Sequence, residues 1–293
     1  MDVLTPPIVE NPGMETHIHP FEVSSIIKNK STNSYLHTSP EFNMKKVLAE
    51  TDLDNIFTIS YCFRDEPTSD IHRNQFLMLE WYRKNKRYEK IMDDVESLIT
   101  YSLEYLNEKL VPIKNNNIQF ERVTMDELFQ EFLNFSILDF LDTTELVSKI
   151  KKDHKDIPLP NVECDWDDYF FLIFLNKIEK KLENFPYILI SEYPKHLSAL
   201  STISKKDPRV CERFEVYMSG IEICNCFNEI TNYDELKMRF LEQQKDKKRI
   251  YNYKLSWPEE FLNTMKNYPQ SAGIALGVER LLKSIVKTEK IFF

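Results

Sequence analysis

The chain has 293 residues, of which 42% are hydrophobic, and this is enough to bury a sizeable core in one large domain or two small ones. Its formal net charge is −9 and its pI is near 5.3. This acidic balance argues against broad, sequence-independent binding to a nucleic-acid backbone, which needs clustered Lys and Arg.

Cysteine usage and apolar runs indicate the compartment. The five cysteines stand at irregular spacing, which suits reduced thiols better than a disulfide framework. The first residues, "MDVLTPPIVENPG", carry no export signal, and the longest strongly apolar run, "YFFLIFL" at 169–175, is too short to span a bilayer. We therefore expect a soluble cytoplasmic protein that does not bind a membrane.

Three zones follow one another along the chain. Residues 1–123 read as mostly extended, with a helix near 85–110 whose apolar residues recur at helical spacing. Residues 124–184 read as short helices, the first opened by a capping box of Thr124 and Glu127. Residues 185–293 return to strands, followed by a helix and by "AGIALGVERLLKSI". We expect one domain over 1–293 with a mainly helical insertion at about 124–184, although periodicity alone leaves a separate helical domain open.

The segment from Phe63 to Tyr82 reads as a hairpin of two alternating strands. In "QFLMLEWY" one face carries Phe76, Glu80 and Tyr82, and Arg64 at the end of the preceding strand falls beside them. A cation, an aromatic plate, a carboxylate and a phenol on one face are suited to a ligand floor. The alternative is an ordinary amphipathic hairpin with a solvated polar face, and spacing alone leaves both interpretations open.

The last segment predicts a strand that passes into a helix near Val278. Gly273 and Gly277 lie four residues apart in it, at a spacing that fits neither the Walker nor the Rossmann pattern. Arg280 then falls in the first turn of the helix, where a cation opposes the helix dipole. It therefore needs an anionic or aromatic partner, unless it is a plain surface arginine.

The segment "GIEICNCFNEI" carries two glutamates at an odd interval. Glu222 and Glu229 are seven residues apart, so in a regular strand they face opposite sides. If both serve one pocket, a bulge or a bend has to lie between them.

Together these segments resemble the class II aminoacyl-tRNA synthetases. "FRDE…HRNQFLMLEWY" is similar to motif 2, "GIALGVERL" to motif 3, and "MDVLTPPIVENPG" to the second half of motif 1. "TSPEFNMKKVL" and the two glutamates resemble the lysyl branch, and in particular its elongation factor P–(R)-β-lysine ligases, over nearly the whole chain. The resemblance implies an α+β fold, with a mixed, mainly antiparallel six-stranded sheet flanked by helices, and no anticodon-binding domain.

The resemblance also implies a nucleotide site. It places these residues at ATP: Arg64, Asp65, Glu66, His72, Arg73, Phe76, Glu222, Ile223, Gly277 and Arg280. Arg64 would hold the α-phosphate, Glu66 the adenine edge and His72 the terminal phosphates. Phe76 and Arg280 would stack on the two sides of adenine. Glu222 would hold Mg²⁺ with the phosphates, and Arg64, Glu222 and Arg280 would be the catalytic set. Arg73 stands where the family has an asparagine that contacts ATP.

An amino-acid site is implied beside it. It comprises Ser39, Pro40, Glu41, Tyr82, Glu229 and Ala275. Glu41 would bind the backbone-side ammonium of the substrate, and Glu229 with Tyr82 would bind the far one. Ala275 stands where lysyl-tRNA synthetases usually have glycine and the β-lysine ligases have alanine.

The implied reaction has two steps. Lysine or (R)-β-lysine is activated by ATP as an aminoacyl-adenylate, and the acyl group then passes to a lysine side chain of elongation factor P. A lysyl-tRNA synthetase-like enzyme that acylates tRNA or another carrier is the alternative, which the acidic charge disfavours, and a non-catalytic regulator is a third. The resemblance further implies a homodimer.

Overall fold

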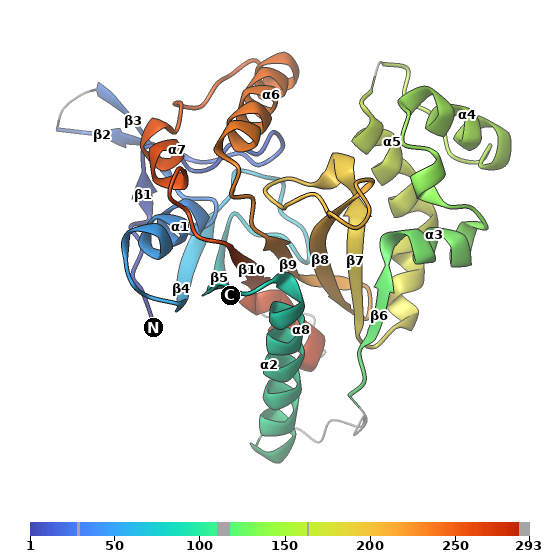
Figure 1. Cartoon of the computed structure of the whole chain (residues 1–293), viewed down its shortest axis with the longest axis horizontal. Helices are drawn as coiled ribbons and strands as arrows, with labels where there is room; N and C mark the ends of the chain where they lie inside the picture. The colour runs from blue at the N-terminus through green and yellow to red at the C-terminus, as the bar shows by residue number, and fades with distance from the viewer. Residues whose placement is uncertain (28–29, 110–117, 163, 287–293) are drawn as a thin grey trace. The chain divides into compact units, whose positions relative to one another are not determined.

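The computed structural model describes residues 1–27, 30–109, 118–162 and 164–286, and it divides into two compact units (Figure 1). Unit 1 joins Met1–Ile91 to Asn228–Phe293, and unit 2 is Met92–Phe227. The expectation of one domain with an insertion at 124–184 stays a prediction.

Unit 1 is built on two groups of strands. A small sheet has the order β1-β3-β2, with β1 at Ile8–Val9, β2 at Glu22–Ser25 and β3 at Lys30–Leu36. The larger group has the order β4-β5-β10 and is antiparallel, with β4 at Asn55–Phe63, β5 at Gln75–Lys84 and β10 at Ser271–Gly277. The predicted hairpin is therefore confirmed.

Among its described residues, unit 1 also has the helices α1 at Glu41–Glu50, α6 at Tyr233–Tyr251, α7 at Glu259–Met265 and α8 at Val278–Val286. Phe42 of α1 stacks on Phe261 of α7 with ring centroids 3.8 Å apart, and Phe240 of α6 packs against both rings. The strand-to-helix change expected near Val278 is confirmed. Helix α1 was not predicted, because it lies within the stretch that we read as mostly extended.

In β4 the apolar face is exposed and the other face is buried, which is the reverse of a solvated amphipathic strand. Its apolar residues Phe57, Ile59 and Tyr61 are 38%, 57% and 52% exposed, whereas Thr58 and Cys62 on the other face are buried. The alternative of a hairpin with a solvated polar face is therefore wrong. Alternation showed that β4 has two different faces but could not show which face the rest of the unit covers.

Unit 2 carries four strands and the long helix α2. Helix α2 is Tyr88–Lys109, and the strand order is β9-β8-β7-β6, with β6 at Glu121–Thr124, β7 at Ile188–Pro194, β8 at Val210–Met218 and β9 at Ile221–Asn228. Only the β6–β7 pair is parallel among these described strands. The mixed, mainly antiparallel character that we expected is therefore confirmed. The described strands β4 to β10 number seven, whereas six were expected.

The helical part of unit 2 gathers beside β6 and β7 (Figure 1). It comprises α3 at Met125–Leu133, a 3₁₀ turn η1 at Ile137–Asp139, α4 at Thr143–Asp153, α5 at Trp166–Ile173, a π-helical turn η2 at Phe174–Ile178, and the 3₁₀ segments η3 at Glu179–Asn184 and η4 at Lys195–Leu197. The predicted capping box is present, because Glu127 N donates to Thr124 Oγ1 and Thr124 N donates to the Glu127 carboxylate. Phe129 and Phe170 of this region are fully buried in one apolar core with Ile188 of β7.

Two further expectations can be compared with the structure. None of the five cysteines is in a disulfide, as their irregular spacing predicted. Within the described ranges, no helix has both the length and the apolar character needed to cross a membrane.

Candidate functional site

Arg64 lies at the end of β4, where the hairpin loop begins. Its Nε donates to the carbonyl oxygen of Thr38 at 3.3 Å, and its Cζ lies 5.2 Å from the centroid of the Phe76 ring on β5. Asn74 closes the loop, because its side-chain amide donates to the carbonyl oxygens of Arg64 and Glu66 at 2.9 and 2.8 Å. The guanidinium and the aromatic ring are therefore held next to each other by the backbone of the hairpin.

Arg280 lies in the first turn of α8 and faces the same loop. Its Nη2 donates to His72 Nε2 at 3.0 Å, and its Nε lies 3.4 Å from the carbonyl oxygen of Ile71. The neighbouring Glu279 accepts the Leu77 amide of β5 with both oxygens, at 2.8 and 3.0 Å. A carboxylate at this helix start suits the dipole, and Arg280 has the aromatic partner that its position required. Arg280 is thus connected to the hairpin loop, and its contact with a nucleotide stays a prediction.

The other loop residues assigned to ATP are more open. Asp65 donates its amide to the carbonyl oxygen of His19 at 2.7 Å, and its side chain is exposed, as are those of His72 and Arg73. Gly277 lies at the end of β10, and a methyl group added there would meet only the Arg280 side chain, at 3.5 Å. The roles given to these residues stay predictions.

An acidic cluster around the start of α1 is the second group of assigned residues in unit 1. Ser39 and Pro40 lead into α1, and the Pro40 carbonyl accepts the Met44 amide at 2.9 Å, so Glu41 is the first helical residue. Lys45 Nζ lies 2.6 Å from Glu41 Oε1 and 2.6 Å from Glu229 Oε2. The structure therefore brings together the two glutamates that we assigned to opposite ends of the substrate, with a lysine of the chain between them.

The strand register places four further residues on one face of the β4-β5-β10 group. Tyr82 pairs with Gly273 and Glu80 pairs with Ala275, so their side chains share a face. Tyr82 Oη donates to Glu80 Oε1 at 2.7 Å. A Cβ at Gly273 would lie 2.2 Å from the Tyr82 ring and 2.7 Å from Glu229 Oε1, so only glycine fits there. Tyr82, Glu80 and Glu229 therefore lie around one backbone position.

Burial dominates the electrostatics of this cluster. Burial, reinforced by Glu41, raises the pKa of Glu80 well above its ordinary value. Burial raises the pKa of Glu229 to about 8, although Lys45 opposes the shift. For Lys45, burial alone would lower the pKa, but Glu229 and Glu41 outweigh it and the pKa is raised. A cation bound beside Glu80 and Glu229 would favour their ionised forms and lower both pKa values.

Glu222 and Ile223 lie in unit 2, on β9. Val216 of β8 pairs with Cys224 and the next residue, Tyr217, pairs with Glu222, so Ile223 is the extra residue of a bulge. The irregularity that the odd interval required is therefore present between Glu222 and Glu229. Glu222 is partly exposed, and a single carboxylate together with phosphate oxygens is a donor set that suits Mg²⁺.

A partly buried arginine contacts the neighbouring part of β9. Arg213 of β8 donates through Nε to Asn225 Oδ1 at 3.1 Å, and it pairs with the Glu215 carboxylate. Tyr193 and Tyr217 donate to the other Glu215 oxygen at 2.7 Å each. This contact assigns the Asn225 oxygen as the acceptor from Arg213 and so fixes the orientation of the amide.

Comparisons with known proteins identify the family of this chain. Residues 1–292 match the family described as tRNA synthetases class II (D, K and N). The chain belongs to this family. A relative from Hamiltonella defensa subsp. Acyrthosiphon pisum (strain 5AT), named elongation factor P–(R)-beta-lysine ligase, is 30% identical over 297 residues, which cover 99% of this chain and 86% of the relative. One of the same name from Pectobacterium atrosepticum is 29% identical, and a homolog of that ligase from Aquifex aeolicus is 30% identical, over 99% of this chain and 86% and 89% of theirs.

Three residues of this class II chain were not assigned to the site from sequence. Glu80 was placed on the ligand face but given no role, because a carboxylate in an alternating strand reads as a solvated group. Asn225 was given no role, because an asparagine inside a strand carries no signal by itself. Lys45 gave no signal in sequence, since a lysine on a helix is usually exposed and this one is 1% exposed.

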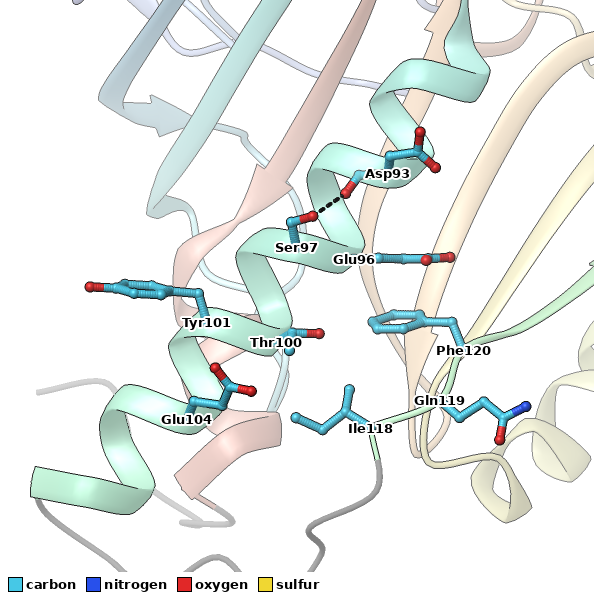
Figure 2. A pocket seen from close by; sticks show the side chains of 9 residues that line it. All are labelled: Asp93, Glu96, Ser97, Thr100, Tyr101, Glu104, Ile118, Gln119 and Phe120. Atoms are coloured by element: carbon cyan, nitrogen blue, oxygen red, sulfur yellow. Dashed lines mark hydrogen bonds between the residues drawn. The ribbon is translucent and has the colours of Figure 1, made fainter.

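A separate open pocket of about 640 Å³ lies in unit 2, between α2 and the segment that precedes β6 (Figure 2). The residues that line it are Asp93, Glu96, Ser97, Thr100, Tyr101, Glu104, Ile118, Gln119 and Phe120. Arg122 already pairs with Asp93 and Glu96, at 3.0 and 2.8 Å. No residue that we assigned to ATP or to the amino acid lines this pocket.

Proposed function

We propose that this chain is a ligase that activates lysine or (R)-β-lysine with ATP and transfers the acyl group to a lysine side chain of elongation factor P. One observation carries the proposal: the buried Glu80 and Glu229 and the partly buried Glu41 form an acidic cluster with Lys45 in unit 1. Buried carboxylates are rare because of their desolvation cost, and ammonium groups are the ligands that repay it. The names of the relatives support the same substrate and acceptor.

The residues divide the work between the two ends of the substrate. Glu41 binds the ammonium next to the reacting carboxylate, while Glu229 and Glu80, the latter oriented by the Tyr82 hydroxyl, bind the far ammonium. Ser39 and Pro40 set the start of α1, which positions Glu41, and Ala275 lies across from Glu80. Glutamates held at a fixed separation bind an amino acid with two ammonium groups more tightly than an amino acid with only one.

The nucleotide is bound through the hairpin loop and α8. Arg64, His72 and Arg73 contact the phosphates, Asp65 and Glu66 lie at the nucleotide, and Phe76 and Arg280 contact adenine. Gly277 lets the backbone approach the nucleotide. Ile223 also lies at the nucleotide. Glu222 holds Mg²⁺, which would neutralise phosphate charge when it is bound.

The reaction itself needs no protein nucleophile. A carboxylate oxygen of the amino acid attacks the α-phosphorus, and the bond to pyrophosphate breaks. Arg64 stabilises the charge that builds on the α-phosphate oxygens. The amine of the acceptor lysine then attacks the acyl carbon, AMP leaves, and the amine loses its proton as the amide forms.

A homodimer is part of the proposal. The exposed face of β4, with Phe57, Ile59 and Tyr61, is an apolar surface in unit 1. Met1–Val3 runs along this strand, where Phe57 N donates to the Met1 carbonyl and Val3 N donates to the Phe57 carbonyl. Apolar residues gathered on a strand face are typical of a protein–protein interface.

The experiment is an intact-mass measurement of elongation factor P after incubation with the protein, ATP and Mg²⁺. Lysine and (R)-β-lysine are supplied in separate reactions, and tRNA replaces elongation factor P in parallel ones. We expect one aminoacyl group to be added to elongation factor P and none to tRNA. Label on tRNA alone would favour tRNA acylation, the activity that the family name describes, and no transfer to either would reject the proposal.

A further inference from the structure

Lys45 is buried in the acidic pocket that we assign to the amino acid, and it faces inward from α1. Its side chain is 1% exposed, and its ammonium contacts Glu41 and Glu229 at 2.6 Å each. Its helix neighbours Met44 and Leu48, which are fully buried too, are apolar. The helix therefore replaces one apolar core position by a cation.

Stability alone does not account for this lysine. A buried ion pair repays its desolvation only with good geometry, and well-packed apolar residues in its place are often as stable or more so. A helix that needed only to pack could continue the series of Met44 and Leu48. The ammonium of Lys45 therefore has a role other than packing.

The net charge of the cluster around Lys45 indicates this role. Glu41, Glu80 and Glu229 carry three negative charges when ionised, and Lys45 carries one positive charge, which leaves a surplus of two negative charges. Glu15 is also near Glu41, but Arg64 and Lys247 both act on it with the opposite sign. The two ammonium groups of a diamino acid neutralise a surplus of two.

Geometry adds a second argument. Glu41 lies on α1, whereas Glu229 follows β9, and its amide donates to the Ser271 carbonyl at 3.0 Å. Two carboxylates repel each other across a pocket of low dielectric, and each has several rotamers. A single ammonium that contacts one oxygen of each carboxylate offsets this repulsion and restricts the rotamers of both side chains.

We propose that Lys45 is a positioning and specificity-determining residue: it holds Glu41 and Glu229 at the two ends of the amino-acid pocket and sets the pocket's charge to match a ligand with two ammonium groups. This inference rests on the proposed function. Lys45 touches neither ATP nor the reacting carboxylate, so it acts through the two glutamates.

The test compares Lys45→Met with Lys46→Met in ATP–pyrophosphate exchange. Lys46 is adjacent on α1 but pairs with Glu260, whose side chain is 79% exposed. We expect Lys45→Met to raise KM for the diamino acid by about 10–100-fold, the range for a hydrogen bond to a charged group, with KM for ATP within about twofold. Lys46→Met should change neither constant. A KM for the diamino acid within about threefold of wild type in Lys45→Met would overturn the inference.

A second comparison covers the case in which Lys45→Met does not fold, since it leaves buried carboxylates unpaired. The double variant Lys45→Met with Glu229→Gln removes one of those charges, and Glu229→Gln alone is its reference. ATP should raise the melting temperature of both variants. If Lys45 orients Glu41, the diamino acid raises the melting temperature of the double variant less than it raises that of Glu229→Gln. Equal rises in the two variants would refute the positioning role of Lys45. If wild type exchanges with no diamino acid, the proposed function and this inference fall together, whereas normal exchange by Lys45→Met removes the inference alone.

Discussion

Arg280 and His72 lie 208 positions apart in the chain, and their side chains are in contact. The guanidinium donates to the imidazole at 3.0 Å, so the start of α8 is connected to the tip of the hairpin loop. This contact brings together the two segments that the family resemblance assigned to one nucleotide, and it lies entirely within unit 1.

Replacing Arg280 should affect the nucleotide rather than the loop. We expect Arg280→Met to lower kcat/KM for ATP by about 100-fold, because a charged partner of the nucleotide is lost. Lys283→Met is the matched control: Lys283 is one turn further along α8 and donates to the Asp70 carbonyl at 3.0 Å, in the same loop. ATP–pyrophosphate exchange measures both variants, and equal losses would mean that α8 serves only to hold the loop.

Glu80 should matter for the amino acid and not for ATP. Glu80→Gln keeps the side-chain volume and removes the charge from a position that is 1% exposed. We expect KM for the diamino acid to rise by about 10–100-fold and KM for ATP to stay the same. Glu260→Gln, which changes an exposed carboxylate in the same unit, is the control. An unchanged KM for the diamino acid in Glu80→Gln would remove Glu80 from the pocket.

The affinity for the diamino acid should increase with pH. The pKa of Glu229 is raised to about 8, so near neutral pH the carboxyl of the empty pocket is largely protonated. A bound ammonium favours the ionised form and lowers this pKa, so binding releases a proton. We expect Kd to fall between pH 6.5 and about 8 and then to level off. Calorimetry in buffers of different ionisation enthalpy counts the protons, and proton uptake or no exchange would contradict this electrostatic account.

The two glycines of β10 should differ in what they tolerate. A methyl group at Gly273 would lie 2.2 Å from the Tyr82 ring, so Gly273→Ala has to displace the ring or the strand. We expect it to destabilise the protein by about 1–3 kcal/mol and to weaken diamino-acid binding. At Gly277 the same methyl group has ordinary contact with Arg280, at 3.5 Å.

Gly277→Ala should therefore melt like wild type but bind ATP more weakly, because a nucleotide that approaches the backbone meets the new methyl group. Thermal melting and ATP titration separate the two effects. Full ATP affinity in Gly277→Ala would show that the nucleotide does not approach that backbone.

The apolar face of β4 should carry the dimer. We expect wild type to have about twice the 35.0 kDa chain mass in solution, and Ile59→Asp, at a residue 57% exposed, to be a monomer, because a charge in an apolar interface is left without a partner. Val162→Asp introduces the same charge at an apolar residue of unit 2 that is 70% exposed, and should not change the mass. Light scattering at micromolar concentration decides this, and a monomeric wild type would reject the dimer.

Local patterns predicted the elements that depend on local chemistry. The capping box set the start of α3 at Met125, and the change from alternating to helical spacing placed the junction of β10 and α8 at Val278. Helix α1 escaped notice because its inward face holds Lys45 among apolar residues, so its pattern is weakly amphipathic. The sequence could not predict which face of β4 is exposed, because tertiary packing decides which face of a strand is covered.

The site could be predicted only as far as motifs reach. Family motifs named Glu41, Tyr82 and Glu229, but the pairing of Tyr82 with Gly273 and of Glu80 with Ala275 is a property of strand register. Lys45 contacts both Glu41 and Glu229, and Glu229 lies 184 positions further along the chain. No local sequence pattern encodes a contact over that separation.

The most direct test of diamino-acid activation is ATP–pyrophosphate exchange by the wild-type protein with a panel of amino acids that includes lysine, (R)-β-lysine and norleucine, which lacks the far amine. We predict exchange with at least one lysine isomer and none above background with norleucine, since a buried acidic pocket rejects an apolar chain end. Exchange with neither lysine isomer, or equal exchange with norleucine, would contradict the account.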